Sequence, residues 1–273
     1  MTDSVSASTP ALPLFYRELV AFDTAQHGEL AFPAVLADYR FAAQTNIIPL
    51  LINEIPLAIQ HYPLVFLPGT GTEPPTLAAL VGMGDGKNCF VGVDHQWRAD
   101  TYIPAWVRRY PFLAVNAEGQ ADPLLALDPT AECLSAQGGE RFVDGGGKPT
   151  PRMEFVIAYL NEFQQMALRT QNIVKALSES GVLEEGSLRF EPGTADNAGE
   201  AREIKGFLIV SESRLRTLSA QAIANLHQAD ALGLAYAQLF SLVNLSTVIN
   251  ARATPEKSPA SPTRSATTRK TTH

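Results

Sequence analysis

The sequence predicts an α+β fold in which helices from the C-terminal half pack on an antiparallel sheet from the N-terminal half. Two observations lead to this prediction. Up to about residue 150, prolines and glycines separate short apolar runs, which is typical of short strands joined by tight turns. Beyond that point apolar residues recur every three or four positions, which is typical of helices with one buried face. Because tight turns join antiparallel neighbours, we expect the sheet to be antiparallel.

Two segments of the N-terminal half share one residue pattern, 48 residues apart. One starts at Asn53 and the other at Thr101, and both read polar residue, any residue, Ile-Pro, five residues, Tyr-Pro, apolar residue. The first proline fits the first turn of a short helix capped by Asn53 or Thr101, because no N–H is needed there. The second proline forces the tyrosine before it into an extended conformation. Each segment is therefore predicted to turn from a helix into a strand.

Four apolar runs continue these two segments. They cover residues 64–67 and 77–81 in the first copy, and residues 112–115 and 124–127 in the second. Each copy would thus be a helix–strand–strand unit, which arose either by duplication or by chance in a proline-rich chain. The Asp85-Gly86 pair tolerates positive φ angles, so a tight turn is predicted between strand 77–81 and a further strand over 89–93.

The longest predicted helix covers residues 151–180. Thr150 should be its N-cap, Pro151 suits its first turn, and Gly181 stands where a left-handed residue often ends a helix. Its expected buried face comprises Val156, Tyr159, Leu160, Phe163, Met166, Ala167, Ile173, Val174 and Leu177.

Three more elements are predicted after this helix. Residues 207–210 read as a short buried strand, and Ser219 should cap a helix over residues 220–228. A last helix is predicted over residues 230–249. The residues expected to form its packing surface are Leu232, Tyr236, Leu239, Phe240, Val243 and Leu245.

Composition excludes several classes of protein. The formal net charge of −7 argues against a general nucleic-acid binder. The first fifteen residues lack the basic start and apolar run of a secretory signal, and no apolar stretch is expected to reach the roughly 20 residues that span a bilayer. Cys89 and Cys133 form no CxxC pair, which fits a reducing compartment. We therefore expect a cytoplasmic protein without a membrane span.

The two ends of the chain differ in composition from its middle. Residues 1–12 are rich in Ser, Thr, Ala and Pro, and residues 251–273 contain five Lys/Arg against one Glu and no large apolar residue. Such segments bury too little surface to offset their ordering entropy. We predict disorder over residues 1–12 and 251–273 and one α+β domain over residues 13–250. The basic tail either aids solubility or binds an acidic partner.

No linear motif for catalysis, metal binding or a cofactor is present. The glycines from Gly82 to Gly86 lack the spacing of a phosphate-binding loop, and Asn88 stands where that motif has Ser or Thr. The histidines are scattered without ligand spacing, and no GxSxG motif occurs. We therefore expect neither a metal nor a cofactor, and favour a function without catalysis.

The best candidate for a binding site surrounds the second copy of the repeated pattern. Its residues are Trp97, Tyr102, Trp106, Arg108, Arg109 and Tyr110, of the types that most often anchor interfaces. Adjacent arginines on a short helix point in different directions, so at least one should be exposed. One interpretation is structural, with favourable charge at a helix C-terminus and stacking on an aromatic ring. The other is a clamp for a carboxylate or phosphate, because the guanidinium fork fits planar oxyanions.

The same segment carries a family resemblance. The run from Tyr102 to Phe112 resembles the Tyr-x-Pro-Ala-x-x-Arg-Arg-Tyr-Pro-Phe signature of the SapC family, bacterial proteins named for an association with a surface layer. Similar features extend almost from end to end, among them His27, Tyr62-Pro63, Asn88, Arg141-Phe142, residues 206–210 and Tyr236 to Asn244. The resemblance implies no defined catalytic residues, and its surface-layer label fits poorly with a chain that lacks an export signal.

These observations predict an accessory protein that recognises a protein or peptide partner through the aromatic and arginine residues. Two alternatives stay open. An enzyme acting on amino-acid or peptide substrates would need a deep pocket with convergent titratable groups. A structural component of a surface layer would need a non-classical export route. No oligomeric state is predicted.

Overall fold

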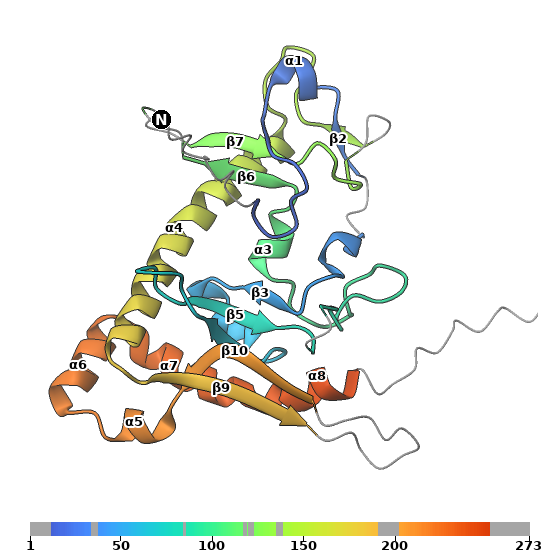
Figure 1. The fold of residues 1–273 in the computed structure, drawn as a ribbon. Helices are drawn as coiled ribbons and strands as arrows, with labels where there is room; N and C mark the ends of the chain where they lie inside the picture. The colour runs from blue at the N-terminus through green and yellow to red at the C-terminus, as the bar shows by residue number, and fades with distance from the viewer. Residues whose placement is uncertain are drawn as a thin grey trace, which may run out of the picture.

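The computed structural model describes residues 12–33, 38–83, 86–116, 119, 123–134, 139–190 and 202–251. The fold is α+β, as predicted, with antiparallel sheets from the N-terminal half and helices in the C-terminal part (Figure 1). The predicted disorder at the two ends falls, apart from Leu12 and Ala251, outside the described residues.

The larger sheet combines strands from both halves of the chain. Its five strands follow the order β3-β5-β4-β10-β9, and all neighbours are antiparallel. They are β3 (Ile47–Pro49), β4 (Leu64–Leu67), β5 (Thr76–Leu80), β9 (Leu183–Phe190) and β10 (Arg202–Val210). The predicted strand 207–210 is the end of β10, so the C-terminal half extends the sheet as well as covering it.

Two smaller sheets lie in the upper part of Figure 1. One has the order β1-β7-β6, and the other pairs β2 with β8. Their strands are β1 (Val20–Ala21), β2 (Ala31–Phe32), β6 (Phe112–Val115), β7 (Leu124–Leu127) and β8 (Glu140–Arg141). The short helices α1 (Thr24–His27) and η1 (Arg40–Ala42) lie in the chain that leads into β2 and β3.

The two predicted units form hairpins with the same register. The equivalent Cα partners are Leu64 with Ala79 and, 48 residues on, Phe112 with Leu127. The next backbone bonds also match, since Leu80 N donates to Pro63 O at 2.9 Å and Asp128 N donates to Pro111 O at 3.0 Å. The residue pattern therefore predicted the two strands of each unit correctly, and the structure adds that they pair as hairpins with a common register.

The predicted helix caps of these units are wrong. The helices are α2 (Ile55–Ala58) and α3 (Ala105–Arg108). Asn53 lies inside the 3-10 helix η2 (Ile52–Glu54), one turn before α2. Pro104 precedes α3, and Thr101 Oγ1 instead donates to Arg98 O at 2.6 Å. The start of α3 is held by a side chain from the other unit, as the site below shows.

The predicted strand over residues 89–93 does not form. Cys89 N donates to Val81 O at 2.8 Å, as in a hairpin. Cys89 and Phe90 then lie in a turn, and Val91 makes only an isolated bridge with Trp97. The apolar run therefore folds back on itself and does not add a strand to the sheet.

The long helix α4 (Pro151–Glu179) connects the two larger sheets along the left side of Figure 1. Thr150 caps it as predicted, because its Oγ1 accepts from Met153 N at 3.4 Å, and Gly181 follows with φ +74°. At about 1.5 Å per residue its 29 residues extend roughly 43 Å. Leu160 packs beside the three-stranded sheet and Leu177 beside the five-stranded sheet.

Four helices end the described chain. They are α5 (Glu212–Arg216), α6 (Ala220–Gln228), α7 (Ala231–Ser241) and α8 (Leu245–Ala251), with the 3-10 turn η3 (Leu242–Asn244) between the last two. Ser219 caps α6 as predicted. Ala231–Ile249 contains 19 residues of mean hydropathy 1.5, which is long and apolar enough to cross a membrane by length and composition, contrary to the expectation from sequence.

The predicted packing surface of this last helix is wrong in part. Tyr236, Phe240 and Val243 are exposed, whereas Gln238 and Ser241 are fully buried. The reason is tertiary, because Gln238 and Ser241 bond to the backbone of the neighbouring strands and fix the rotation of the helix.

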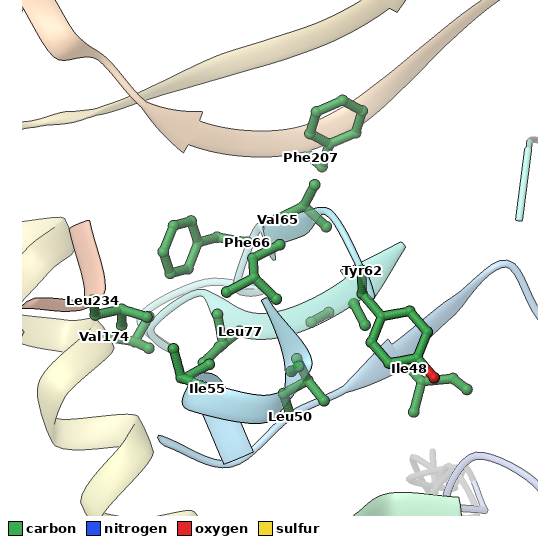
Figure 2. Close-up of a cluster of buried hydrophobic side chains, with 14 of the residues drawn as sticks. Ile48, Leu50, Ile55, Tyr62, Val65, Phe66, Leu77, Val174, Phe207 and Leu234 are labelled. Atoms are coloured by element: carbon green, nitrogen blue, oxygen red, sulfur yellow. The ribbon is translucent and has the colours of Figure 1, made fainter. Parts of the chain in front are cut away.

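The main core lies between the five-stranded sheet and the helices. Figure 2 shows the side chains of Ile55 and Leu77 beside Val174 from α4 and Leu234 from α7. These residues belong to a single cluster of buried apolar side chains. The first helix–strand–strand unit is therefore part of the molecular interior.

Candidate binding site

Three of the six predicted binding residues are buried, and two of these three, Trp97 and Tyr110, pack into the interior of the fold. Trp97 and Tyr110 are 7% and 8% exposed. Trp97 Nε1 donates to the Tyr62 hydroxyl at 3.2 Å, and the Tyr110 ring stacks on Phe41 with centroids 4.2 Å apart. Both side chains therefore support the fold around the site.

The other four residues lie on α3 or just before it. Tyr102 and Trp106 are half-buried, Arg108 is exposed and Arg109 is only 5% exposed. The two arginines point apart, as expected for neighbours on a helix, and one of them reaches solvent.

Glu54 of the first unit holds the start of α3. Its Oε1 accepts from Ala105 N at 2.6 Å and from the Tyr102 hydroxyl at 2.9 Å, and its Oε2 accepts from Leu51 N at 2.7 Å. Burial raises the pKa of this carboxyl above its usual value, against the lowering effect of the hydrogen bonds. Sequence reasoning missed this contact because Glu54 and Ala105 are 51 residues apart. Both oxygens of Glu54 are engaged in structural bonds.

A pocket of about 430 Å³ opens between α3, the first turns of α4 and the chain around η1. Its size and its mainly apolar walls are typical of ligand sites. Its walls include Phe32, Tyr39, Phe41, Val107, Val156 and Tyr159. Three arginines also line it, Arg108, Arg109 and Arg152, against a single carboxylate, Asp38.

Arg109 is the most buried of the three pocket arginines. Its guanidinium carbon lies 3.9 Å from the ring centroid of Trp106 and 4.6 Å from that of Phe163. Among the described residues no carboxylate pairs with it, and its Nε is buried without a hydrogen-bond partner. Burial lowers the pKa of Arg109, but a guanidinium stays charged in proteins. A buried unpaired cation costs free energy that an anionic ligand would relieve.

A second buried donor without a partner lies beside it. The indole N–H of Trp106 makes no hydrogen bond, and Trp106 and Arg109 hold the two such side-chain atoms found in the described part of the chain. Both residues belong to the predicted site. Unpaired buried donors are rare in folded proteins, so their occurrence side by side marks this position as unusual.

Aromatic rings hold the other two arginines at the pocket. Arg108 donates to the Tyr102 hydroxyl at 2.9 Å, and its guanidinium carbon lies 5.6 Å from the Tyr159 ring centroid. The guanidinium carbon of Arg152 lies 4.4 Å from the ring centroid of Phe32. Both arginines line the pocket, and no ion pair joins either of them to another described residue.

The single pocket carboxylate is already paired. Asp38 contacts Arg40 at 2.7 Å. Burial acts to raise the pKa of Asp38, but the bonds to Arg40 hold it below its usual value. Arg40 also contacts Glu132 at 2.8 Å. The pocket wall therefore carries three arginines, and its one carboxylate already has a counter-charge in Arg40.

The titratable groups around the pocket include one thiol, Cys133. Burial raises the pKa of this thiol to about 11, so the nucleophilic thiolate is scarce at neutral pH. Within the described ranges no group of three or more His, Cys, Asp or Glu side chains could hold a metal ion. The arrangement offers guanidinium donors and apolar walls to an anion that carries an apolar group.

Sequence reasoning missed the α4 side of the pocket. Arg152 was not singled out, and Val156 and Tyr159 were assigned only to a buried face. The three residues follow the i, i+4, i+7 spacing of one helix face, and this spacing could have predicted that their side chains lie together. That this face meets α3 depends on the tertiary structure.

Comparison with known proteins gives one match. The SapC family model matches residues 22–248, a range that contains every pocket residue named above. Comparisons with curated proteins and with solved structures found no match.

Proposed function

The chain belongs to the SapC family, and we propose that it is a non-catalytic accessory protein that recognises a protein or peptide partner at the arginine pocket. The partner would present a carboxylate, from its C-terminus or an acidic side chain, next to an apolar side chain. The carboxylate would approach Arg109 and Arg108, and the apolar group would lie against the aromatic walls.

The observation that carries this proposal is the buried guanidinium of Arg109, which pairs with no carboxylate of the described residues and whose Nε has no hydrogen-bond partner there. A folded protein rarely keeps a cation that is 5% exposed without a counter-charge, because desolvation of the ion is costly. Such a group persists where function requires it. The planar fork matches a carboxylate with two hydrogen bonds, which supports a carboxylate as the ligand group.

A direct test uses the fluorescence of Trp106, which lies 3.9 Å from the Arg109 guanidinium carbon. In a Trp97→Phe background Trp106 is the remaining tryptophan. We expect N-acetylphenylalanine to change its emission with a dissociation constant on the order of 1 mM, since so small a probe makes few contacts. The amide of the same compound lacks the carboxylate and should have no effect at equal concentration.

Partner capture tests the biological role. The parent chain, Arg109→Met, and Arg98→Met as the matched control, would be used as bait in lysate of the source organism, followed by mass spectrometry. Arg98 is exposed and lies outside the pocket. We expect parent and control to retain the same proteins and Arg109→Met to lose them. Capture that survives Arg109→Met contradicts the proposal.

A further inference from the structure

Three large apolar side chains form an exposed stripe along α7 and η3. Tyr236, Phe240 and Val243 are 46%, 69% and 76% exposed. Their spacing of four and three residues puts them on one face of the helix, and the rings of Tyr236 and Phe240 stack with centroids 6.2 Å apart. A helix on the surface of a soluble protein normally turns its apolar face toward the core. Here α7 buries Leu234 and Ala235, but it leaves this second apolar face on the outside.

The opposite face is held inward by polar side chains. Gln238 and Ser241 are both 0% exposed. Gln238 Oε1 accepts from Val210 N at 3.0 Å, its Nε2 donates to Leu64 O at 3.1 Å, and Ser241 Oγ accepts from Leu64 N at 2.8 Å. Rotating the helix to bury Phe240 would leave these backbone groups unpaired. The fold therefore fixes the stripe on the outside.

Charged residues are distributed unevenly along the sequence that contains the stripe. No charged residue occurs from Ala231 to Ala251. Residues 252–273, which follow at once, contain five Lys/Arg and one Glu and so carry a net charge of +4. The whole chain carries −7, which leaves −11 for residues 1–251. An apolar helix face next to a basic segment is the combination that binds anionic lipid surfaces.

We propose that the stripe docks on an anionic lipid bilayer. Tyr236, Phe240 and Val243 insert at the boundary between headgroups and acyl chains, and the basic residues of 252–273 are attracted to the headgroups. A surface of this kind lies on the membrane and needs no spanning segment. The stripe shares no residue with the arginine pocket, so this inference does not depend on the proposed partner binding.

Other occupants fit the stripe less well. Residues 252–273 contain no large apolar side chain, so they have little to bury against it. A second copy of the chain would bring two basic segments together, and a stable interface buries about 800 Å² per partner, more than three side chains supply. A bilayer requires only a few inserted side chains, and it attracts the basic charge.

Co-sedimentation of the full chain with lipid vesicles tests the inference. The vesicles would contain phosphatidylcholine alone, or phosphatidylcholine mixed with phosphatidylglycerol. We expect binding to the anionic vesicles alone, and weaker binding as salt is raised because the charges are screened. Replacing Phe240 and Val243 together by serine should weaken binding by about tenfold or more. The matched control is Leu168→Ser on α4, where the replaced side chain is 64% exposed, and it should bind like the parent.

Two further measurements separate the sources of binding. Replacing Arg264, Arg269 and Lys270 together by glutamine should weaken binding by about tenfold or more, because each basic residue near the surface contributes separately. Phe240→Trp should show a blue-shifted emission with anionic vesicles, which reports insertion directly and does not depend on the serine variants being folded.

Several outcomes would overturn the inference. They are the absence of binding to anionic vesicles, equal binding to neutral vesicles, and full binding by the variant with both serines. A dimer in analytical ultracentrifugation that this variant abolishes, together with no vesicle binding, would assign the stripe to a second copy. Capture of a protein through the stripe without vesicle binding would likewise replace the bilayer by that protein.

Discussion

The two helix–strand–strand units share their spacing and their hairpin register, but they occupy different surroundings. In the first unit, β4 lies between β5 and β10 in the five-stranded sheet and is almost entirely buried. In the second unit, β6 is an edge strand of the three-stranded sheet, and α3 lines a pocket. The enclosed unit forms part of the core, and the unit at the edge borders the arginine pocket.

Residues at equivalent positions of the two units differ in burial and in bonding partners. Adding 48 to the residue number relates Glu54 to Tyr102 and His61 to Arg109. Glu54 and Tyr102 bond to each other, so the two units meet at the same position of the pattern. Arg109 is buried among rings, whereas His61 is half-buried. A repeated local pattern thus builds the same turn from helix to strand twice. The elements that pack around each turn decide whether its side chains are buried and what they bond to.

The largest change in stability is expected from a substitution that breaks the contact between the two units. Glu54→Ala leaves three donors without an acceptor, namely Leu51 N, Ala105 N and the Tyr102 hydroxyl. We expect it to lower the free energy of unfolding by about 4 kcal/mol, because each unpaired buried donor costs about 1 to 3 kcal/mol. Tyr102→Phe, at the equivalent position, removes only one of these partners and should cost about 1 kcal/mol. Urea denaturation measures both, and equal losses would contradict the capping role of Glu54.

The next effect compares the two hairpins at one position. Leu77 and Leu125 are equivalent by the same offset, but Leu77 is 1% exposed and Leu125 is only partly buried. Leu77→Ala should cost about 3 kcal/mol, through lost burial and the cavity left behind, and Leu125→Ala about 1 kcal/mol. Thermal and urea unfolding would measure the two values. A larger loss at Leu125 would mean that the second hairpin contributes more to the core than its exposure indicates.

A smaller effect with the opposite sign is expected at Arg109. Arg109→Met removes a buried unpaired charge and keeps an apolar side chain of similar length, so the free energy of unfolding should rise by about 1 kcal/mol. The same variant should lose the response to N-acetylphenylalanine. Arg98→Met is the control for both measurements, since that side chain is exposed. A destabilised Arg109→Met would show that the contacts to Trp106 and Phe163 outweigh the desolvation of the cation.

The smallest effect concerns pH. Burial raises the pKa of Glu54, so the folded protein keeps this proton to a higher pH than the unfolded chain does. The stability that Glu54 contributes is therefore greatest below the usual carboxyl range, and part of it is lost as pH rises through the raised pKa. The difference in free energy of unfolding between the parent and Glu54→Ala should shrink from about pH 4 to about pH 8. A difference that grows with pH would mean that the hydrogen bonds outweigh burial.

Several features controlled by residues close in sequence were predicted correctly, but the caps at Asn53 and Thr101 and the strand over residues 89–93, which are equally local, were not. The caps at Thr150 and Ser219, the turn at Gly181 and the strands after each Tyr-Pro pair depend on neighbours a few positions away, and the structure contains all of them. The arginine pair was also found from local composition. The surroundings of Arg109 were not predicted, because the burial of its guanidinium and the lack of a paired carboxylate among the described residues depend on the elements that pack around it.

The sequence by itself determined the α+β class, the long helix and the two strands of each repeated unit, because turn geometry and hydrophobic periodicity are short-range. Tertiary structure alone decided that Glu54 holds the start of α3, that Arg152 and Tyr159 join the arginine pocket, and that α7 turns Phe240 outward. The physical reason is that burial and hydrogen-bond pairing depend on which elements meet, and residues far apart in the chain decide that together.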